Sequence, residues 1–159
     1  LFYGPDGNED PADITRFILE FENNKNAGMV VARRLGPKSV NKEDNKLFKP
    51  RKWVNIAFNR MANILWNQSG YIYDTINGFR AITRETWDTI KIDTEGYTVE
   101  YQSTIRCFKK NIQIVEFPTK ELQRIGNRKG SPAFHTGLKF IGLFLYEIFL
   151  SLITILKIK

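Results

Sequence analysis

Residues 1–32 read LFYGPDGNEDPADITRFILEFENNKNAGMVVA, and their composition alternates between strand-like and helix-like segments. Residues 1–3 are apolar and aromatic, as at the end of a strand, and residues 4–8 are dense in turn-forming residues. Residues 10–13, Asp-Pro-Ala-Asp, are typical of a helix start with the first aspartate as the N-cap. Residues 28–32 have the composition of a short buried strand. This strand, helix, strand unit predicts a parallel α/β sheet with a ligand-binding loop after its first strand.

The chain after residue 32 continues the alternation of helices and strands. The pattern predicts helices at residues 51–66, 83–90 and 99–108, a strand at 111–117 and an apolar helix at 140–156. The helix at 51–66 has an apolar face that includes Trp53 and Ile64, and an amide face that includes Asn59 and Asn63. Helical spacing of this kind indicates that the aromatic side chains pack in the core.

Composition and charge limit the class of protein. A chain of 159 residues is long enough for one domain with a real core, and its single cysteine, Cys107, is expected to be a small buried residue. The net charge is +7, and the bases are clustered: five bases and no acid lie between Asp44 and Asp74, and seven bases with two acids lie between Lys109 and Lys139. Such clusters favour anionic partners, which include phosphates, nucleic acids and acidic lipid headgroups.

Residues 140–156 are apolar around the whole helix, with Glu147 as their one charge. At about 1.5 Å per residue this helix is about 26 Å long, just short of the hydrocarbon core of a bilayer. The flanking lysines Lys139, Lys157 and Lys159 suit an interfacial membrane anchor. We therefore expect membrane contact, and a buried core helix in a soluble protein is the alternative.

Several short motifs follow one another along the chain in a fixed order. They are the Asp6-Gly7-Asn8 turn before Asp10-Pro11, then Val31-Ala32-Arg33, Asn59-Arg60-Met61-Ala62-Asn63, the Asp74 to Arg80 turn, Gly96-Tyr97-Thr98-Val99-Glu100, Glu116-Phe117-Pro118 and a basic Gly-Ser segment at 124–131. In spacing and order these motifs resemble family 2 glycosyltransferases, in particular the dolichyl-phosphate mannosyltransferase-like branch. The resemblance covers almost the whole chain and corresponds to the C-terminal part of the family's catalytic domain, so we expect an earlier part to precede Leu1.

The resemblance implies a fold and an activity. The fold class is α/β, a partial A-type glycosyltransferase (nucleotide-diphospho-sugar transferase) fold with a C-terminal apolar helix. Residues 1–134 are expected to belong to the catalytic domain and residues 135–159 to a membrane-associated helix. The implied reaction is an inverting displacement that moves a sugar from a nucleotide diphosphate sugar to a polyprenyl phosphate or another glycolipid acceptor. The implied location is the cytoplasmic face of a membrane, in cell envelope glycan synthesis.

The resemblance also implies a divalent metal, Mg²⁺ or Mn²⁺, with Asp6 and Asn8 as ligands and Asp6 as a catalytic residue. Carboxylate and amide oxygens are suitable ligands, and the metal neutralises charge that develops on the diphosphate leaving group. The family's first aspartate falls on Gly4 in this chain, so tight metal binding requires a compensating ligand from Glu9, Asp10 or the earlier part of the protein. An Asp-Gly turn that binds no metal is the alternative.

Five further residues are expected to bind substrate: Arg33, Asp74, Arg80, Arg124 and Lys129. A guanidinium after a turn can bind phosphate oxygens of an anionic acceptor in two places at once. A phosphate acceptor is already ionised near neutral pH and needs no strong general base. If the acceptor is a sugar hydroxyl, Glu100 is the expected base, and a helix-end carboxylate without a chemical role is the alternative. His135, the lone histidine, is expected to be structural.

Two other classes of protein fit part of the sequence. The basic charge and the aromatic residues are compatible with a nucleic-acid-binding domain, but no motif of the usual recognition modules is present. A noncatalytic membrane-docking scaffold would explain Gly4. We expect the transferase, with no nucleic-acid partner.

Overall fold

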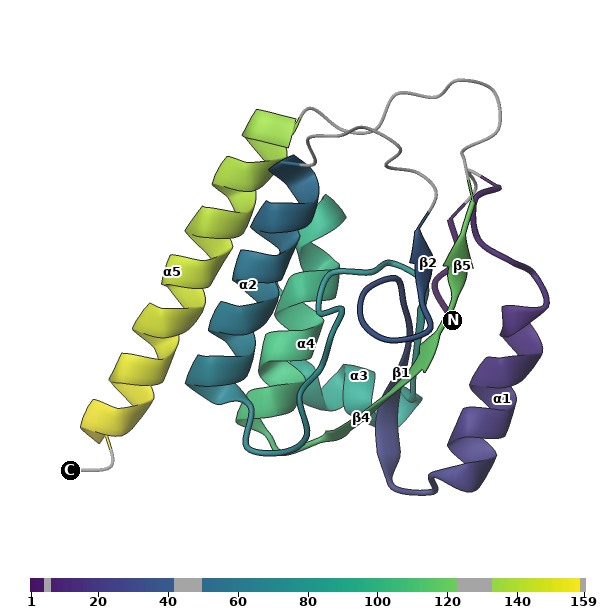
Figure 1. Ribbon diagram of the computed structural model, residues 1–159. Coiled ribbons are helices and arrows are strands. Elements are labelled where there is room, and N and C mark those ends of the chain that lie inside the picture. The colour runs from purple at the N-terminus through teal and green to yellow at the C-terminus, as the bar shows by residue number, and fades with distance from the viewer. Residues whose placement is uncertain (5–6, 42–49, 123–132, 158–159) are drawn as a thin grey trace.

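The computed structural model describes residues 1–4, 7–41, 50–122 and 133–157, which form a mixed α/β fold (Figure 1). In chain order the elements are α1 (Asp13–Asn23), β1 (Ala27–Arg33), β2 (Val40–Asn41), α2 (Pro50–Trp66), β3 (Arg80–Ile82), α3 (Arg84–Ile90), the 3-10 turn η1 (Gly96–Thr98), α4 (Val99–Lys109), β4 (Gln113–Pro118), β5 (Lys120–Glu121) and α5 (Ala133–Lys157). The expected α/β class and the expected helices at 51–66, 83–90 and 99–108 are confirmed.

The main sheet is mixed, so the expectation of a parallel sheet was wrong in part. Its order is β3-β1-β4, with β1 parallel to β4 and antiparallel to β3. Residues 1–3, expected to end a strand, make only an isolated antiparallel bridge from Phe2 to Arg80. A second, two-stranded parallel sheet joins β2 to β5.

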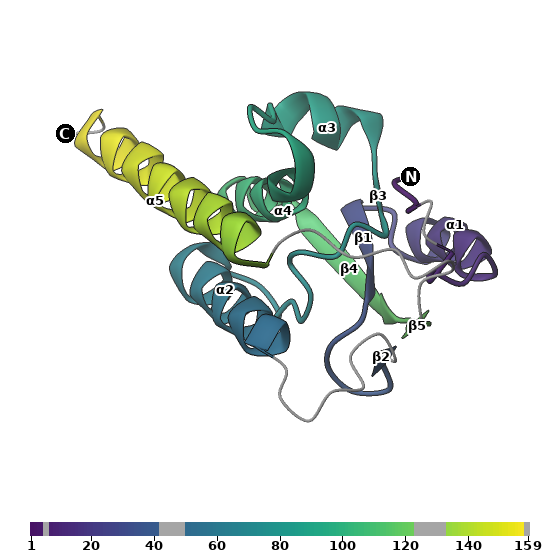
Figure 2. The same ribbon diagram turned by 90° about the horizontal axis from the view of Figure 1, so that it is seen from above.

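Strand β1 is buried on both faces, which explains its continuous apolar run. On one face, Val30 and Ala32 pack with Phe17 of α1 and with aromatic residues that flank them in the sheet. On the other face, Met29 and Val31 pack against α3 and α4. The sheet is therefore the middle layer, with α1 on one side and the remaining helices on the other (Figures 1 and 2).

Helix α1 begins later than expected. The expected N-cap, Asp10, accepts a hydrogen bond from the Ala12 amide at 3.0 Å, which forms a tight local turn, and the N-cap position falls on Ala12. Among the apolar residues of α1, Phe17 is buried and Phe21 packs against the same cluster, whereas Ile14 and Ile18 are exposed. By contrast, α3 begins as expected, because the Thr83 hydroxyl accepts a hydrogen bond from the Thr86 amide.

Helix α2 has the expected length but the opposite orientation. Asn59 and Asn63, from its amide face, are buried, whereas Trp53 is 68% exposed and Ile64 is 80% exposed. The reason lies in the backbone at residues 72–75. Asn59 binds the carbonyl of Tyr73 and the amide of Thr75, and Asn63 binds both backbone groups of Ile72. A buried loop backbone needs such partners, so the amides face inward.

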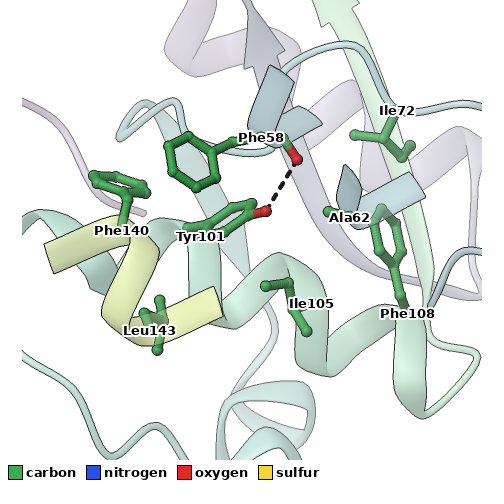
Figure 3. Close-up of a cluster of buried hydrophobic side chains, with 8 residues drawn as sticks. All are labelled: Phe58, Ala62, Ile72, Tyr101, Ile105, Phe108, Phe140 and Leu143. Carbon is green, nitrogen blue, oxygen red and sulfur yellow. Dashed lines mark hydrogen bonds between the residues drawn. The ribbon is translucent and has the colours of Figure 1, made fainter. Parts of the chain in front are cut away.

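Helix α5 packs along α2 and α4 through a cluster of aromatic and aliphatic side chains (Figures 2 and 3). The cluster consists of Phe58, Ala62, Ile72, Tyr101, Ile105, Phe108, Phe140 and Leu143. The Tyr101 hydroxyl donates to the Phe58 carbonyl at 2.9 Å, so its polar atom is satisfied inside the cluster. The expected domain division between residues 134 and 135 falls inside α5, and His135 is exposed in its first turn.

The one charge in the apolar part of α5 is also buried. Glu147 accepts hydrogen bonds from Gln102 and Arg106 at 2.9 Å each and from Lys109 at 2.7 Å, all on α4. The opposite face of α5 is exposed and apolar, and includes Leu145, Phe149 and Leu152. By length and composition, residues His135–Leu156 are sufficient to cross a membrane, and little of this segment is buried in the structure.

Candidate functional site

The candidate site lies where the parallel strands β1 and β4 end. Arg33, the last residue of β1, is in register with Pro118, the last residue of β4. The turn at residues 72–80 crosses this edge, because the Asn77 side chain donates to the Ala32 carbonyl of β1. Side chains from both strands and from the start of α4 therefore lie around this turn. Ligands of α/β sheets commonly bind at such carboxyl ends.

Asp74 is fully buried at the centre of this turn. Its carboxylate accepts hydrogen bonds from Arg34 Nε at 2.9 Å and Arg34 Nη2 at 3.1 Å, and also from the Arg34 amide at 2.9 Å. Burial opposes ionisation of Asp74, but the charge and hydrogen bonds of Arg34 outweigh it and lower the pKa of Asp74. Asp74 is thus an ionised anchor between the turn and the end of β1.

Glu116 of β4 holds the same turn from the other strand. Its two carboxylate oxygens accept the backbone amides of Tyr73 at 2.8 Å and Asp74 at 2.9 Å. Burial raises the pKa of Glu116 to about 7, and the nearby Asp74 charge adds to the increase. The turn is therefore fixed by β1, β4 and α2 together.

Arg80 is not at the surface of this site, contrary to the expectation that it binds an acceptor phosphate. It is 1% exposed. Its guanidinium donates to the carbonyls of Asn77, Thr75 and Glu100 and to the hydroxyls of Ser103 and Thr104. Burial lowers the pKa of Arg80 to about 10, and the charges of Glu100 and Asp74 oppose that shift. Because its donors point at protein acceptors, Arg80 joins the turn to α4.

Glu100, in the first turn of α4, lies against the other end of the turn. A Cβ atom added to Gly78 would be 3.5 Å from Glu100 Oε1. Glu100 Oε2 is buried and has no hydrogen-bond partner among the described residues. A buried carboxylate oxygen without a partner is costly, so it marks a place where a proton or a ligand donor would be favourable.

Arg33 is half-buried and packs within its own loop. Its Nη1 donates to the Leu35 carbonyl at 2.9 Å and to Ser39 Oγ at 3.3 Å, and its guanidinium lies over the Tyr73 ring. Gly36 has a φ of +90°, and a Cβ there would lie 2.6 Å from the Arg33 guanidinium. Glycine therefore lets the loop close over Arg33.

The expected metal ligands are only partly within the described residues. Asp6, Arg124 and Lys129 lie outside them. Asn8 is buried, and its side-chain amide donates to Glu121 Oε1 at 3.0 Å. Within residues 1–4, 7–41, 50–122 and 133–157, no three His, Cys, Asp or Glu side chains form a metal-binding group.

Glu9 lies beside Gly4, the position where the resemblance implies an aspartate. Glu9 Oε2 accepts the Gly4 amide at 2.8 Å, and a Cβ at Gly4 would be 3.5 Å from that oxygen. A carboxylate is therefore present next to Gly4, supplied from five residues further along the chain.

Sequence reasoning missed two residues that build the site. Arg34 was overlooked because only its neighbour Arg33 fits the family motif, although its partner Asp74 was identified. Glu116 was noted in a motif but not given a role. Comparisons with protein-family models, with curated proteins and with solved structures find no match.

Proposed function

We propose that this chain is the C-terminal part of the catalytic domain of a family 2 glycosyltransferase. Support comes from the order of the motifs and from their convergence. The Asp74 to Arg80 turn, Glu100 and Glu116 belong to three separate motifs, and hydrogen bonds and close contacts bring them together. They meet at the carboxyl ends of two parallel strands, the usual position of a ligand site in α/β sheets.

The observation that carries the proposal is the Glu100 carboxylate. Its Oε1 lies beside Gly78, in a turn that β1, β4 and α2 hold in place, and its buried Oε2 has no hydrogen-bond partner among the described residues. A fixed carboxylate with one free oxygen is suited to accept a proton or a hydrogen bond from an acceptor group.

The proposed reaction moves a sugar from a nucleotide diphosphate sugar to a lipid-linked acceptor with inversion. The acceptor oxygen forms a bond to the anomeric carbon while the bond from that carbon to the diphosphate oxygen breaks. The electron pair of that bond leaves with the nucleotide diphosphate. A divalent metal, Mg²⁺ or Mn²⁺, with Asp6 and Asn8 as ligands belongs to this proposal, as do Arg124 and Lys129 as phosphate-binding residues. A polyprenyl phosphate is the preferred acceptor, on the cytoplasmic face of a membrane.

Two acceptor chemistries are distinguished by Glu100→Gln in the full-length protein. A polyprenyl phosphate is an anion before it binds, so Glu100 removes no proton, and the variant is expected to keep turnover within about tenfold of the parent. A hydroxyl acceptor needs a base, and its loss would lower kcat by about a hundredfold to ten-thousandfold. The measurement is steady-state kinetics with a polyprenyl phosphate and with a glycolipid hydroxyl acceptor.

The matched control is Glu95→Gln, because Glu95 is an exposed carboxylate just before α4. If the protein uses a hydroxyl acceptor, equal effects of the two substitutions on turnover with that acceptor would remove Glu100 from the site. A strong loss in Glu100→Gln with the phosphate acceptor would contradict the preferred acceptor.

A further inference from the structure

The outward face of α2 is apolar and has no cover among the described residues. Trp53, Val54, Ile64 and Leu65 are all exposed large apolar side chains. They are exposed because the opposite face of α2 uses Asn59 and Asn63 to hold the loop at residues 72–75. The orientation of α2 is thus fixed by polar contacts on its inner face, and its apolar face is exposed as a result. An exposed apolar patch of this kind marks an interaction surface.

Helix α5, which lies beside α2, also has an exposed apolar face. Helix α5 lies beside α2, since Phe58 and Trp66 of α2 contact Phe144 of α5 and the Trp66 indole donates to Ser151 at 3.0 Å. The outward apolar side chains of α5 include Leu138, Ile141, Leu145, Phe149, Leu152 and Ile155. Both helices lie on the side of the molecule away from α1 (Figures 1 and 2).

The charge of α2 identifies the kind of partner. The sequence between Asp44 and Asp74 has five bases and no acid, and one of these bases, Arg60, is exposed on α2. A helix that combines an exposed apolar face with positive charge and lacks acids matches an anionic lipid surface, where bases contact headgroups and apolar groups enter the acyl boundary. Tryptophan, as at position 53, favours that boundary.

We propose that the outward faces of α2 and α5 together form one docking surface for an anionic lipid bilayer. On this surface α2 lies in the headgroup region beside α5. The proposal extends the membrane attachment in the proposed function to a second helix, but its readout is lipid contact and does not depend on sugar transfer.

The test places a fluorophore at single positions of the full-length protein. Ile64→Cys on α2, Leu152→Cys on α5 and Ile18→Cys on α1 are exposed sites of similar character, and the native Cys107 is buried. Each variant is labelled with an environment-sensitive dye and mixed with phosphatidylcholine vesicles that contain phosphatidylglycerol and nitroxide-labelled lipid. Quenching at position 64 is expected within about twofold of that at position 152, with none at position 18.

Charge is tested separately with Arg60→Glu and the control Arg84→Glu, an exposed base on α3. Loss of one base at an anionic surface is worth about fivefold in binding, so Arg60→Glu should weaken binding to phosphatidylglycerol vesicles by at least that factor. It should leave binding to pure phosphatidylcholine unchanged, and Arg84→Glu should change neither.

Three results would overturn the proposal. Quenching at position 152 without quenching at position 64 would limit membrane contact to α5. A change in the position 64 dye that grows with protein concentration in the absence of lipid would identify a second copy as the occupant. Equal effects of Arg60→Glu and Arg84→Glu on vesicle binding would show that Arg60 does not contact the anionic headgroups.

Discussion

At the scale of single residues, Arg80 shows how burial changes the role of a motif residue. The Gly-Phe-Arg sequence predicts an exposed cation after a turn, but the guanidinium bonds to five protein acceptors inside the fold. Those acceptors come from the turn itself and from α4, so they are invisible in the local sequence. Arg80 is therefore a structural residue that positions Glu100 and the turn.

The consequence is a prediction about stability. Arg80→Ala would leave several buried acceptors without donors, at about 1–3 kcal/mol each, so we expect a large loss of unfolding free energy. The control Arg84→Ala removes an exposed pair with Asp88 and should cost about 1 kcal/mol or less. Thermal unfolding of both variants measures the difference. An Arg80→Ala variant with unchanged stability and a raised KM for the acceptor would restore the phosphate-binding role.

Glu116 gives a prediction about pH. Its pKa in the fold is raised to about 7, above the ordinary value of about 4.5, so the folded state holds this proton more tightly than the unfolded state. Its contribution to stability is complete below pH 4.5 and is lost as the pH rises to about 7. Glu116→Gln cannot titrate, so the parent should lose stability relative to this variant over that window. Thermal unfolding of the two proteins from pH 4.5 to 8 measures this difference in stability. Parallel curves of unfolding temperature against pH would contradict the raised pKa of Glu116.

At the scale of elements, the sequence predicts helices better than it predicts which face of a helix is buried. Thr83 and the residues after it carry a local capping signal, and α3 begins where that signal predicts. The apolar face of α2 is equally regular but lies outward, because Asn59 and Asn63 find backbone partners in a loop that follows the helix. The antiparallel pairing of β3 with β1 is likewise a long-range contact.

For the candidate site, too, the sequence predicts local features better than contacts between distant residues. Asp74 and Glu100 lie near one another in the fold, because Arg80 joins the turn that contains Asp74 to the start of α4. Arg34 and Glu116 could not be assigned, since their partners are 40 or more residues away in sequence. Motif spacing identified the turn, and only the fold shows which side chains hold it.

Helix α5 is joined to α4 by one buried carboxylate, Glu147. Glu147 is buried among Gln102, Arg106 and Lys109, and its removal takes the carboxylate partner from Lys109 and leaves Arg106 paired with Asp93 alone. Glu147→Ala should therefore lower the unfolding free energy by about 3–5 kcal/mol. The neighbouring Tyr146→Phe loses only a hydrogen bond to Asp93 at the surface and should leave the unfolding temperature almost unchanged. Equal unfolding temperatures for the two variants would show that Glu147 does not hold α5 in place.

At the scale of the whole molecule, the candidate site and the proposed lipid-docking surface lie on different sides of one core. The strand ends with Asp74, Glu100 and Glu116 form the candidate site, while α2 and α5 carry the exposed apolar faces. Helix α2 connects the two, because its amide face holds the turn of the site and its apolar face is the proposed lipid contact. Membrane docking and the geometry of the site thus share one element.

We propose that this protein transfers a sugar to a lipid-linked acceptor. The most direct measurement incubates membranes that contain the full-length protein with radiolabelled nucleotide diphosphate sugars and Mg²⁺ or Mn²⁺, then counts label extracted into organic solvent. We predict that at least one donor gives extractable label above membranes without the protein, and that added polyprenyl phosphate increases it. A folded protein that transfers label from no donor, with or without added polyprenyl phosphate, would contradict the claim.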